Sequence, residues 1–194
     1  RPDAYQKQGG MNTNKAGADF YFLNKIIPLG HFSEINNTMV MPSGRVSDRV
    51  PFGTGRFMSN YLEVKDEPVT TYDVQSYIDL KVLFDKVDKL YKGDTELTTA
   101  QFAHLPASLQ KFLSADEFRS AIAEISRQSN RHSMFVHRFF LWFNAFKIMK
   151  YMHFARDHFY PNVNIVLAAN ALNTLMDETF QHQPDAKELL QHLR

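Results

Sequence analysis

The stretch FVHRFFLWFNAFKIMKYMHFARDHFY, residues 135–160, decides the fold. It holds ten of the chain's 26 aromatic residues and its only tryptophan. Its polar residues recur at three-residue intervals, so they wind around a helix and leave no wide solvent face. A helix that is apolar on most sides belongs in a protein interior. The pattern therefore predicts one continuous helix over 133–159 at the centre of the fold.

Helical patterns also fill the chain on both sides of this stretch. Apolar residues recur at three- and four-residue steps over 70–91, which predicts a long amphipathic helix. Ser114, with Glu117 three residues later, is a capping box and opens another helix. Pro161 ends the central helix, and a further helix is expected over 163–180. The sequence therefore predicts a mainly α fold, a single-domain helical bundle around the central aromatic-rich helix.

The helix expected over 163–180 has a two-sided pattern. We expect its small and apolar residues to face inward, and they are Ala168, Ala169, Leu172, Leu175 and Met176. We expect a polar stripe on the same helix to face water, and it comprises Asn170, Asn173, Asp177 and Gln181. This division is the amphipathic pattern of a surface helix that covers a core.

The first third of the chain differs in composition from the rest. Residues 1–19 are polar and are expected to form a flexible or surface-draped arm. Residues 20–67 are rich in glycine, proline and asparagine, which predicts an irregular segment packed on the core. The change to helical periodicity comes at Pro68. We therefore divide the chain into the arm, the irregular segment and a helical domain over 68–194.

Short apolar runs inside the segment 20–67 leave its local structure open. The run 20–27 fits either a helical turn or a strand. Apolar residues flank the turn-forming pair Asn36 and Asn37, so a short β-hairpin is expected there. Residues 61–64 are expected to add one more short strand.

Charge and cysteine content exclude several classes of function. The chain has 22 Lys and Arg residues against 21 Asp and Glu, so the broad basic surface that binds nucleic-acid backbones is absent, and we expect no nucleic-acid partner. With no cysteine, disulfides, thiolate catalysis and cysteine-ligated zinc are all excluded.

The sequence also bears on membrane insertion and on cellular location. The central stretch carries several cations, and the uncharged run after it contains Pro161 and four asparagines, so we expect no transmembrane span. The first residue is Arg1, not methionine, which fits removal of a signal peptide, proteolytic trimming or a fragment. We expect an exported protein, either periplasmic or secreted.

Histidine and aspartate side chains of the central stretch are the candidates for catalysis. His153 and Asp157 lie four residues apart and share a helical face, where they could exchange a proton or bind a metal ion. His137 is a third candidate, although it lies on the opposite side of a continuous helix. The alternative interpretation is a polar surface pair with no chemistry. The sequence indicates no particular cofactor.

Three arginines of the irregular segment form a local basic cluster. Arg45, Arg49 and Arg56 flank a glycine-rich turn at 53–55, and guanidinium groups with backbone amides could hold a phosphate or carboxylate. No helix start is evident after this turn. The cluster is therefore a candidate anion-binding site, and the alternative is a solvated loop.

These patterns leave three functional hypotheses from different classes. The first is a protein-interaction or structural module in a larger assembly, bound to a protein partner or to further copies of itself. The second is an enzyme or a protein that binds a small apolar ligand in a pocket beside the helix 133–159. The third is a peripheral lipid-binding protein.

Overall fold

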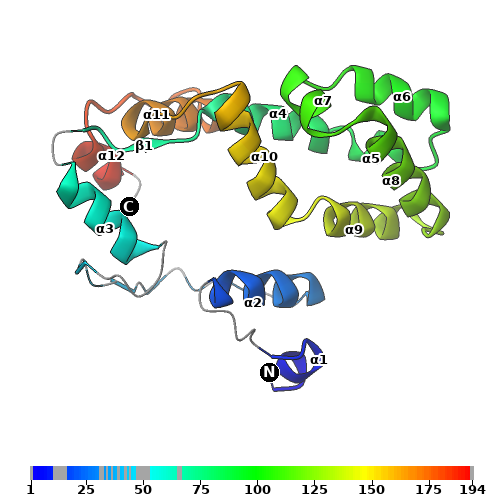
Figure 1. Cartoon of the computed structure of the whole chain (residues 1–194), viewed down its shortest axis with the longest axis horizontal. Coiled ribbons are helices and arrows are strands. Elements are labelled where there is room, and N and C mark those ends of the chain that lie inside the picture. The colour runs from blue at the N-terminus through cyan, green and yellow to red at the C-terminus, as the bar shows by residue number, and fades with distance from the viewer. Residues whose placement is uncertain are drawn as a thin grey trace. The chain divides into compact units, whose positions relative to one another are not determined.

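The computed structural model describes residues 2–10, 17–30, 33, 35, 37–38, 40–41, 43, 45–46, 53–64 and 67–192. The fold is mainly helical, as predicted (Figure 1). The chain divides into two compact units, Arg1–Glu67 and Pro68–Arg194. We call them the N-terminal unit and the C-terminal unit.

The N-terminal unit is more helical than expected. Its described residues form α1 (Pro2–Lys7), α2 (Ala18–Ile26), a 3-10 turn η1 (Ile27–Leu29) and α3 (Thr54–Glu63). The short apolar run at 20–27 is thus helical. Gly30 ends η1 with a φ of 78°, a left-handed conformation that glycine adopts without steric cost.

Helix α3 replaces the strand that we expected over 61–64, so that prediction is wrong. The apolar residues Phe57 and Tyr61 lie four positions apart, and Met58 and Leu62 repeat the same step, which is the helical period. The rings of Phe57 and Tyr61 stack with centroids 6.2 Å apart and an interplanar angle of 14°. This helical pattern begins before residue 61, so residues 61–64 taken alone do not show it.

The hairpin predicted around Asn36 and Asn37 falls largely outside the described residues. Asn36 itself is among the residues left out, whereas Asn37 is described. The described positions between 33 and 46 contain no strand. The hairpin therefore stays a prediction.

The C-terminal unit is a bundle of short helices with one pair of very short strands. In chain order its elements are β1 (Thr70–Thr71), α4 (Val74–Phe84), α5 (Val87–Leu90), α6 (Thr95–Ala103), α7 (Ala107–Phe112), α8 (Ala115–Arg127), α9 (His132–Trp142), α10 (Ala145–His158), β2 (Val163–Asn164), α11 (Ile165–Met176) and α12 (Ala186–His192).

Side-chain caps determine where several of these helices begin. Ser114 Oγ accepts from the Glu117 N–H at 3.1 Å, so the predicted cap of α8 is confirmed. Asp73 caps α4 by accepting from the Gln75 N–H at 2.7 Å. The single long helix expected over 70–91 is wrong, because Thr70 belongs to β1 and two helices, α4 and α5, follow it. Each cap satisfies a helix N–H group that has no partner within the helix.

The central aromatic stretch forms two helices, so the prediction of one continuous helix over 133–159 is wrong. Phe143 has φ −94° and ψ 60°, outside the helical region, and α9 ends there. Asn144 then caps α10, because its Oδ1 accepts from the N–H groups of Phe146 at 3.1 Å and Lys147 at 3.2 Å. Its short polar side chain favours a helix start over a helix interior. Figure 1 shows the change of direction between α9 and α10.

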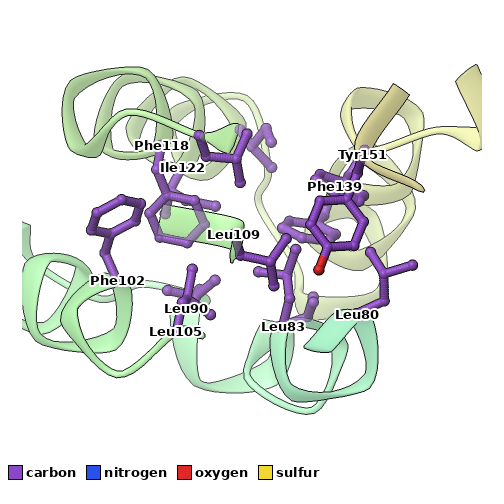
Figure 2. Packing of buried hydrophobic residues seen from close by; sticks show 14 of the residues in the cluster. Leu80, Leu83, Leu90, Phe102, Leu105, Leu109, Phe118, Ile122, Phe139 and Tyr151 are labelled. Atoms are coloured by element: carbon purple, nitrogen blue, oxygen red, sulfur yellow. The ribbon is translucent and has the colours of Figure 1, made fainter. Parts of the chain in front are cut away.

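The hydrophobic core of the C-terminal unit draws on most of its helices. α8 contacts α6 and α9, and α10 contacts α4 and α7. Figure 2 shows Leu109 of α7 between one group that includes Phe102 and Phe118 and another that includes Leu83 and Tyr151. The buried cluster comprises Leu80, Leu83, Val87, Leu90, Phe102, Leu105, Leu109, Leu113, Phe118, Ile122, Ile125, Phe135, Phe139, Phe143, Tyr151, Met152 and Ala155.

An aromatic cluster forms the part of the core that α9 contributes. Phe139 and Phe143 are fully buried, and their rings stack with centroids 6.3 Å apart. Phe84 of α4 meets the ring of Phe143 edge-on at 5.9 Å, and Trp142 meets Phe139 in the same way at 5.6 Å. Edge-on and stacked aromatic pairs add to the stabilisation that burial gives.

The two short strands join the start of α4 to the start of α11. They pair antiparallel, with Thr70 opposite Asn164 and Thr71 opposite Val163. The Ile165 N–H also donates to the Val69 carbonyl at 2.9 Å. This pairing positions α11 beside α4, which it contacts.

Helix α11 differs from its predicted two-sided pattern. Of the residues expected to face inward, Ala168 is buried, but Leu172, Leu175 and Met176 are exposed. In the stripe expected to face water, Asn170 is buried. Its amide donates to the Gln183 carbonyl at 2.8 Å and accepts from the Gln183 N–H at 2.9 Å. The segment after α11 folds back over the polar side, which local periodicity could not indicate.

Candidate functional site

His153 and Asp157 lie one turn apart on α10, and both are exposed. The carboxylate of Asp157 accepts from the guanidinium of Arg156, at 2.7 Å from Nε and 3.1 Å from Nη2. This contact lowers the pKa of the Asp157 carboxyl. The ring of His153 stacks on Tyr72, with centroids 6.1 Å apart. The partner of Asp157 is thus the neighbouring arginine.

His137, the third candidate, lies on α9 and is exposed. The break at Phe143 places it on a different helix from His153, so their relation on a single continuous helix no longer applies. Within the described part of the chain, no three His, Asp or Glu side chains are grouped as metal ligands would be. A catalytic role for His137, His153 and Asp157 stays a prediction.

The predicted anion site is described only in part. Arg45 is exposed, Arg49 lies outside the described residues, and Arg56 is exposed in the first turn of α3. The glycine-rich turn leads directly into this helix, because Gly53 is the residue before Thr54 at its start. We did not expect a helix start there, and its free N–H groups would favour an anion. Anion binding by the three arginines stays a prediction.

A buried polar cluster around Asp79 is the feature that sequence reasoning missed. Asp79 of α4 is 2% exposed, and Ser108 of α7 and Tyr151 of α10 are fully buried. Tyr160, just after α10, is partly buried. Four segments of the C-terminal unit therefore bring one carboxylate and three hydroxyl groups together in the interior.

The carboxylate of Asp79 accepts from every member of this cluster. Its Oδ2 accepts from the hydroxyls of Tyr160 at 2.9 Å, Tyr151 at 3.3 Å and Ser108. Its Oδ1 accepts from Gln75 Nε2 at 2.9 Å. The hydroxyls of Ser108 and Tyr151 also lie 2.9 Å apart. Both oxygens of the buried carboxylate are thereby satisfied, as burial of such a group requires.

The cluster keeps its tyrosines protonated. Burial raises the pKa of Tyr151, and the nearby negative charge of Asp79 raises it further, although the Ser108 hydrogen bond acts in the opposite direction. The pKa of Tyr160 is raised by burial and by its hydrogen bond to Asp79. A protonated phenol donates a hydrogen bond and is a poor nucleophile. The arrangement therefore supports holding α4, α7 and α10 together more than it supports catalysis.

The sequence contained one signal for this cluster. Asp79 follows Ser76 by three residues and precedes Leu83 by four, so it lies on the side of α4 that faces the core. A carboxylate at such a position predicts a buried hydrogen-bonded group. The identity of its partners could not be predicted, since Ser108, Tyr151 and Tyr160 are distant in sequence.

A small pocket opens on another side of the C-terminal unit, between β1, α4 and α11. Its volume is about 140 Å³, and its wall is mainly apolar. The lining residues are Thr71, Tyr72, Val74, Tyr77, Ile165, Ala168, Ala169 and Leu172. None of them belongs to 133–159, although Tyr72 stacks on His153 of that stretch. Binding of a small apolar ligand stays a prediction.

Comparison with known proteins assigns no family to this fold and cluster. No protein-family model, curated protein or solved structure matches the chain significantly. In the described part of the chain, every helix is too short or too polar to cross a lipid bilayer.

Proposed function

We propose that this chain is a protein-interaction module within a larger assembly, and that its N-terminal unit carries the contact surface. The proposal depends on one observation. All buried hydrophobic side chains among the described residues belong to the C-terminal unit, from Val74 to Leu189. The described hydrophobic residues of the N-terminal unit are partly buried or exposed, which is the condition of a segment that buries them further by binding.

Helix α3 has the character of an anchor helix. Phe57 and Tyr61 are about half exposed and lie one turn apart, and Leu62 extends the same apolar side. The other side carries Ser59 and Glu63, whose side chains form a hydrogen bond of 3.2 Å. An amphipathic helix that presents apolar residues at four-residue spacing is the usual ligand of an apolar groove.

Helix α2 and the turn η1 add a second apolar surface to the same unit. Leu23, Ile27 and Leu29 are each nearly half exposed. Large apolar side chains at the centre of an interface contribute most of its binding free energy, and aromatic residues are enriched among them. The partner that fits these helices is a folded protein with an apolar groove.

The experiment compares partners captured by the full-length chain and by a variant of α3. Phe57→Ser with Leu62→Ser removes two apolar contacts and leaves the polar side of the helix unchanged. We expect a partner that is retained by the wild-type chain to lose at least about 10-fold in affinity for this variant, because each change removes a buried side chain from the interface. Quantitative mass spectrometry identifies the partner, and calorimetry with the purified pair gives the affinity.

The matched control is Ser59→Ala with Asn60→Ala on the polar side of α3. We expect this control to retain the partner as the wild-type chain does. A partner that binds the apolar variant and the control equally would contradict the proposal. A native extract that yields no specific partner, together with a wild-type chain that stays monomeric, would also contradict it.

A further inference from the structure

The outer side of α11 exposes a continuous apolar ridge in the C-terminal unit. Leu167 is 68% exposed, Leu175 is 59% exposed, and Ala171 between them is exposed as well. The three residues follow one another at four-residue steps, so their side chains form one ridge along the helix. The next ridge contains Leu172 and Met176, which are also exposed.

The ridge is symmetric along its own length. Leu167 and Leu175 stand four residues before and four residues after Ala171, with the same side chain at both ends and a small one in the middle. A ridge of this kind is complementary to a second copy of itself in antiparallel orientation, because each leucine then meets the partner's other leucine. The small side chain at the centre allows the two helix axes to approach to roughly 8 Å.

The charges around α11 favour the same antiparallel arrangement. None of the 12 residues of the helix is charged. Asp177 and Glu178 follow its C-terminal end, and its N-terminal end is the positive end of the helix dipole. The N–H groups of Ile165 and Val166 at that end already donate to the Val69 carbonyl and to Asn164 Oδ1. In an antiparallel pair, each acidic end lies beside the other copy's positive helix start. A parallel pair would instead place the two acidic ends together.

We propose that two copies of this chain associate through α11, antiparallel, about a two-fold axis that passes near Ala171. The contact is isologous, so each copy contributes the same ridge. Because the i, i+4 ridge of each helix packs into the groove beside the same ridge of the other, the axes cross at about −50°. This inference concerns the C-terminal unit and does not depend on the partner proposed for α3.

The absence of cysteine from the chain makes the axis directly testable. Ala171→Cys introduces a single thiol, and two thiols near a two-fold axis come within disulfide distance. We expect mild oxidation of the full-length variant to give a cross-linked dimer in high yield. Ala123→Cys, at an exposed alanine of α8, is the matched control and should give at least about 10-fold less dimer, because its thiols are held apart.

A charge exchange at the same position tests the geometry without a covalent bond. Ala171→Glu and Ala171→Lys each place two like charges at the axis, so each variant alone should weaken dimerisation at least about 100-fold. An equimolar mixture should recover a dimer that contains one copy of each variant. Analytical ultracentrifugation measures all three samples, and circular dichroism checks that the helices are retained.

Three outcomes would overturn the proposal. The first is a wild-type chain that stays monomeric in ultracentrifugation up to several hundred micromolar. The second is equal cross-linking at positions 171 and 123. The third is a mixture of the two charged variants that does not associate, although each variant keeps its helical spectrum.

Discussion

Each unit of this protein has a phenylalanine within an apolar helical pattern, and the ring is buried in one unit and exposed in the other. Phe143 in the C-terminal unit is fully buried among the rings of Phe84, Phe139 and Trp142. Phe57 in the N-terminal unit is 52% exposed, and its recorded ring contact is Tyr61 of its own helix. The difference shows that residue type does not decide burial here. What decides it is whether several helices converge on the same side chain.

The largest expected effect comes from removing each of these two rings. Phe143→Ala should lower the free energy of unfolding by about 3 to 5 kcal/mol, because it leaves a cavity in the core. Phe57→Ala should change it by less than about 0.5 kcal/mol, because no core is lost. Urea denaturation of both variants measures the difference. Equal losses would mean that the N-terminal unit has a core of its own, and the comparison would fail.

The buried carboxylate of Asp79 gives the second largest effect. Asp79→Ala removes the acceptor of three buried or partly buried hydroxyls and should cost about 2 to 4 kcal/mol of unfolding free energy. Asp85→Ala, directly after the end of the same helix, is the matched control. Its carboxylate pairs with Lys81 in solvent at 2.5 Å, and such an exposed pair is worth less than about 1 kcal/mol. If both aspartates cost the same, the cluster does not stabilise the core.

The raised pKa of Tyr151 predicts a loss of stability at high pH. The folded state keeps this proton at a pH where the unfolded chain, with an ordinary tyrosine pKa of 10.0, releases it. The stabilisation is therefore fully present below about pH 10 and declines as the pH rises further, by up to about 1.4 kcal/mol per pH unit for one group.

Tyr151→Phe tests this dependence, because it removes one titrating group and keeps the ring. Between pH 9.5 and 11, the variant's free energy of unfolding should fall less steeply than that of the wild-type chain. Identical slopes for the variant and the wild-type chain would show that Tyr151 ionises normally in the folded state.

The smallest effect concerns an asparagine in each unit. Asn170→Ala removes two hydrogen bonds to the backbone of Gln183 and should cost about 1 kcal/mol. It should also speed amide hydrogen exchange in the segment that follows α11. Asn60→Ala on α3 should change neither quantity, since Asn60 is exposed. Unchanged exchange after the Asn170 substitution would mean that other contacts hold this segment.

Local signals in the sequence were sufficient for the fold class and for some helix starts. The Ser114 cap was predicted correctly because a capping box acts within three residues. The aromatic richness of 135–160 indicated buried rings, and this is correct for only part of the stretch. Phe140 is 41% exposed, whereas the buried rings are those of Phe135, Phe139, Phe143 and Tyr151. The break at Phe143 was missed because apolar residues continue on both sides of it. Asn144 is a favourable helix N-cap, but a single asparagine is a weak signal within such an apolar stretch.

Long-range contacts account for what the sequence could not show. Asp79 lies on the core side of α4, and its partners come from residues 29 to 81 positions away. Helical periodicity predicted that Asn170 faces solvent, but the segment that contains Gln183 covers it. The exposed leucines of α11 were expected inside for the same reason, because periodicity gives an apolar face and does not say which element covers it.

The pairing of β1 with β2 has a consequence for the order of folding. Thr70 and Asn164 are adjacent although they lie 94 positions apart in the chain, and closing a loop of this size costs on the order of 4 kcal/mol of chain entropy. Two residues of strand cannot offset that cost alone. The pairing can therefore form only after the helices between the strands have collapsed, which makes docking of α11 on α4 a late event. By the same reasoning, α11 is the element we expect to detach first when the C-terminal unit begins to unfold.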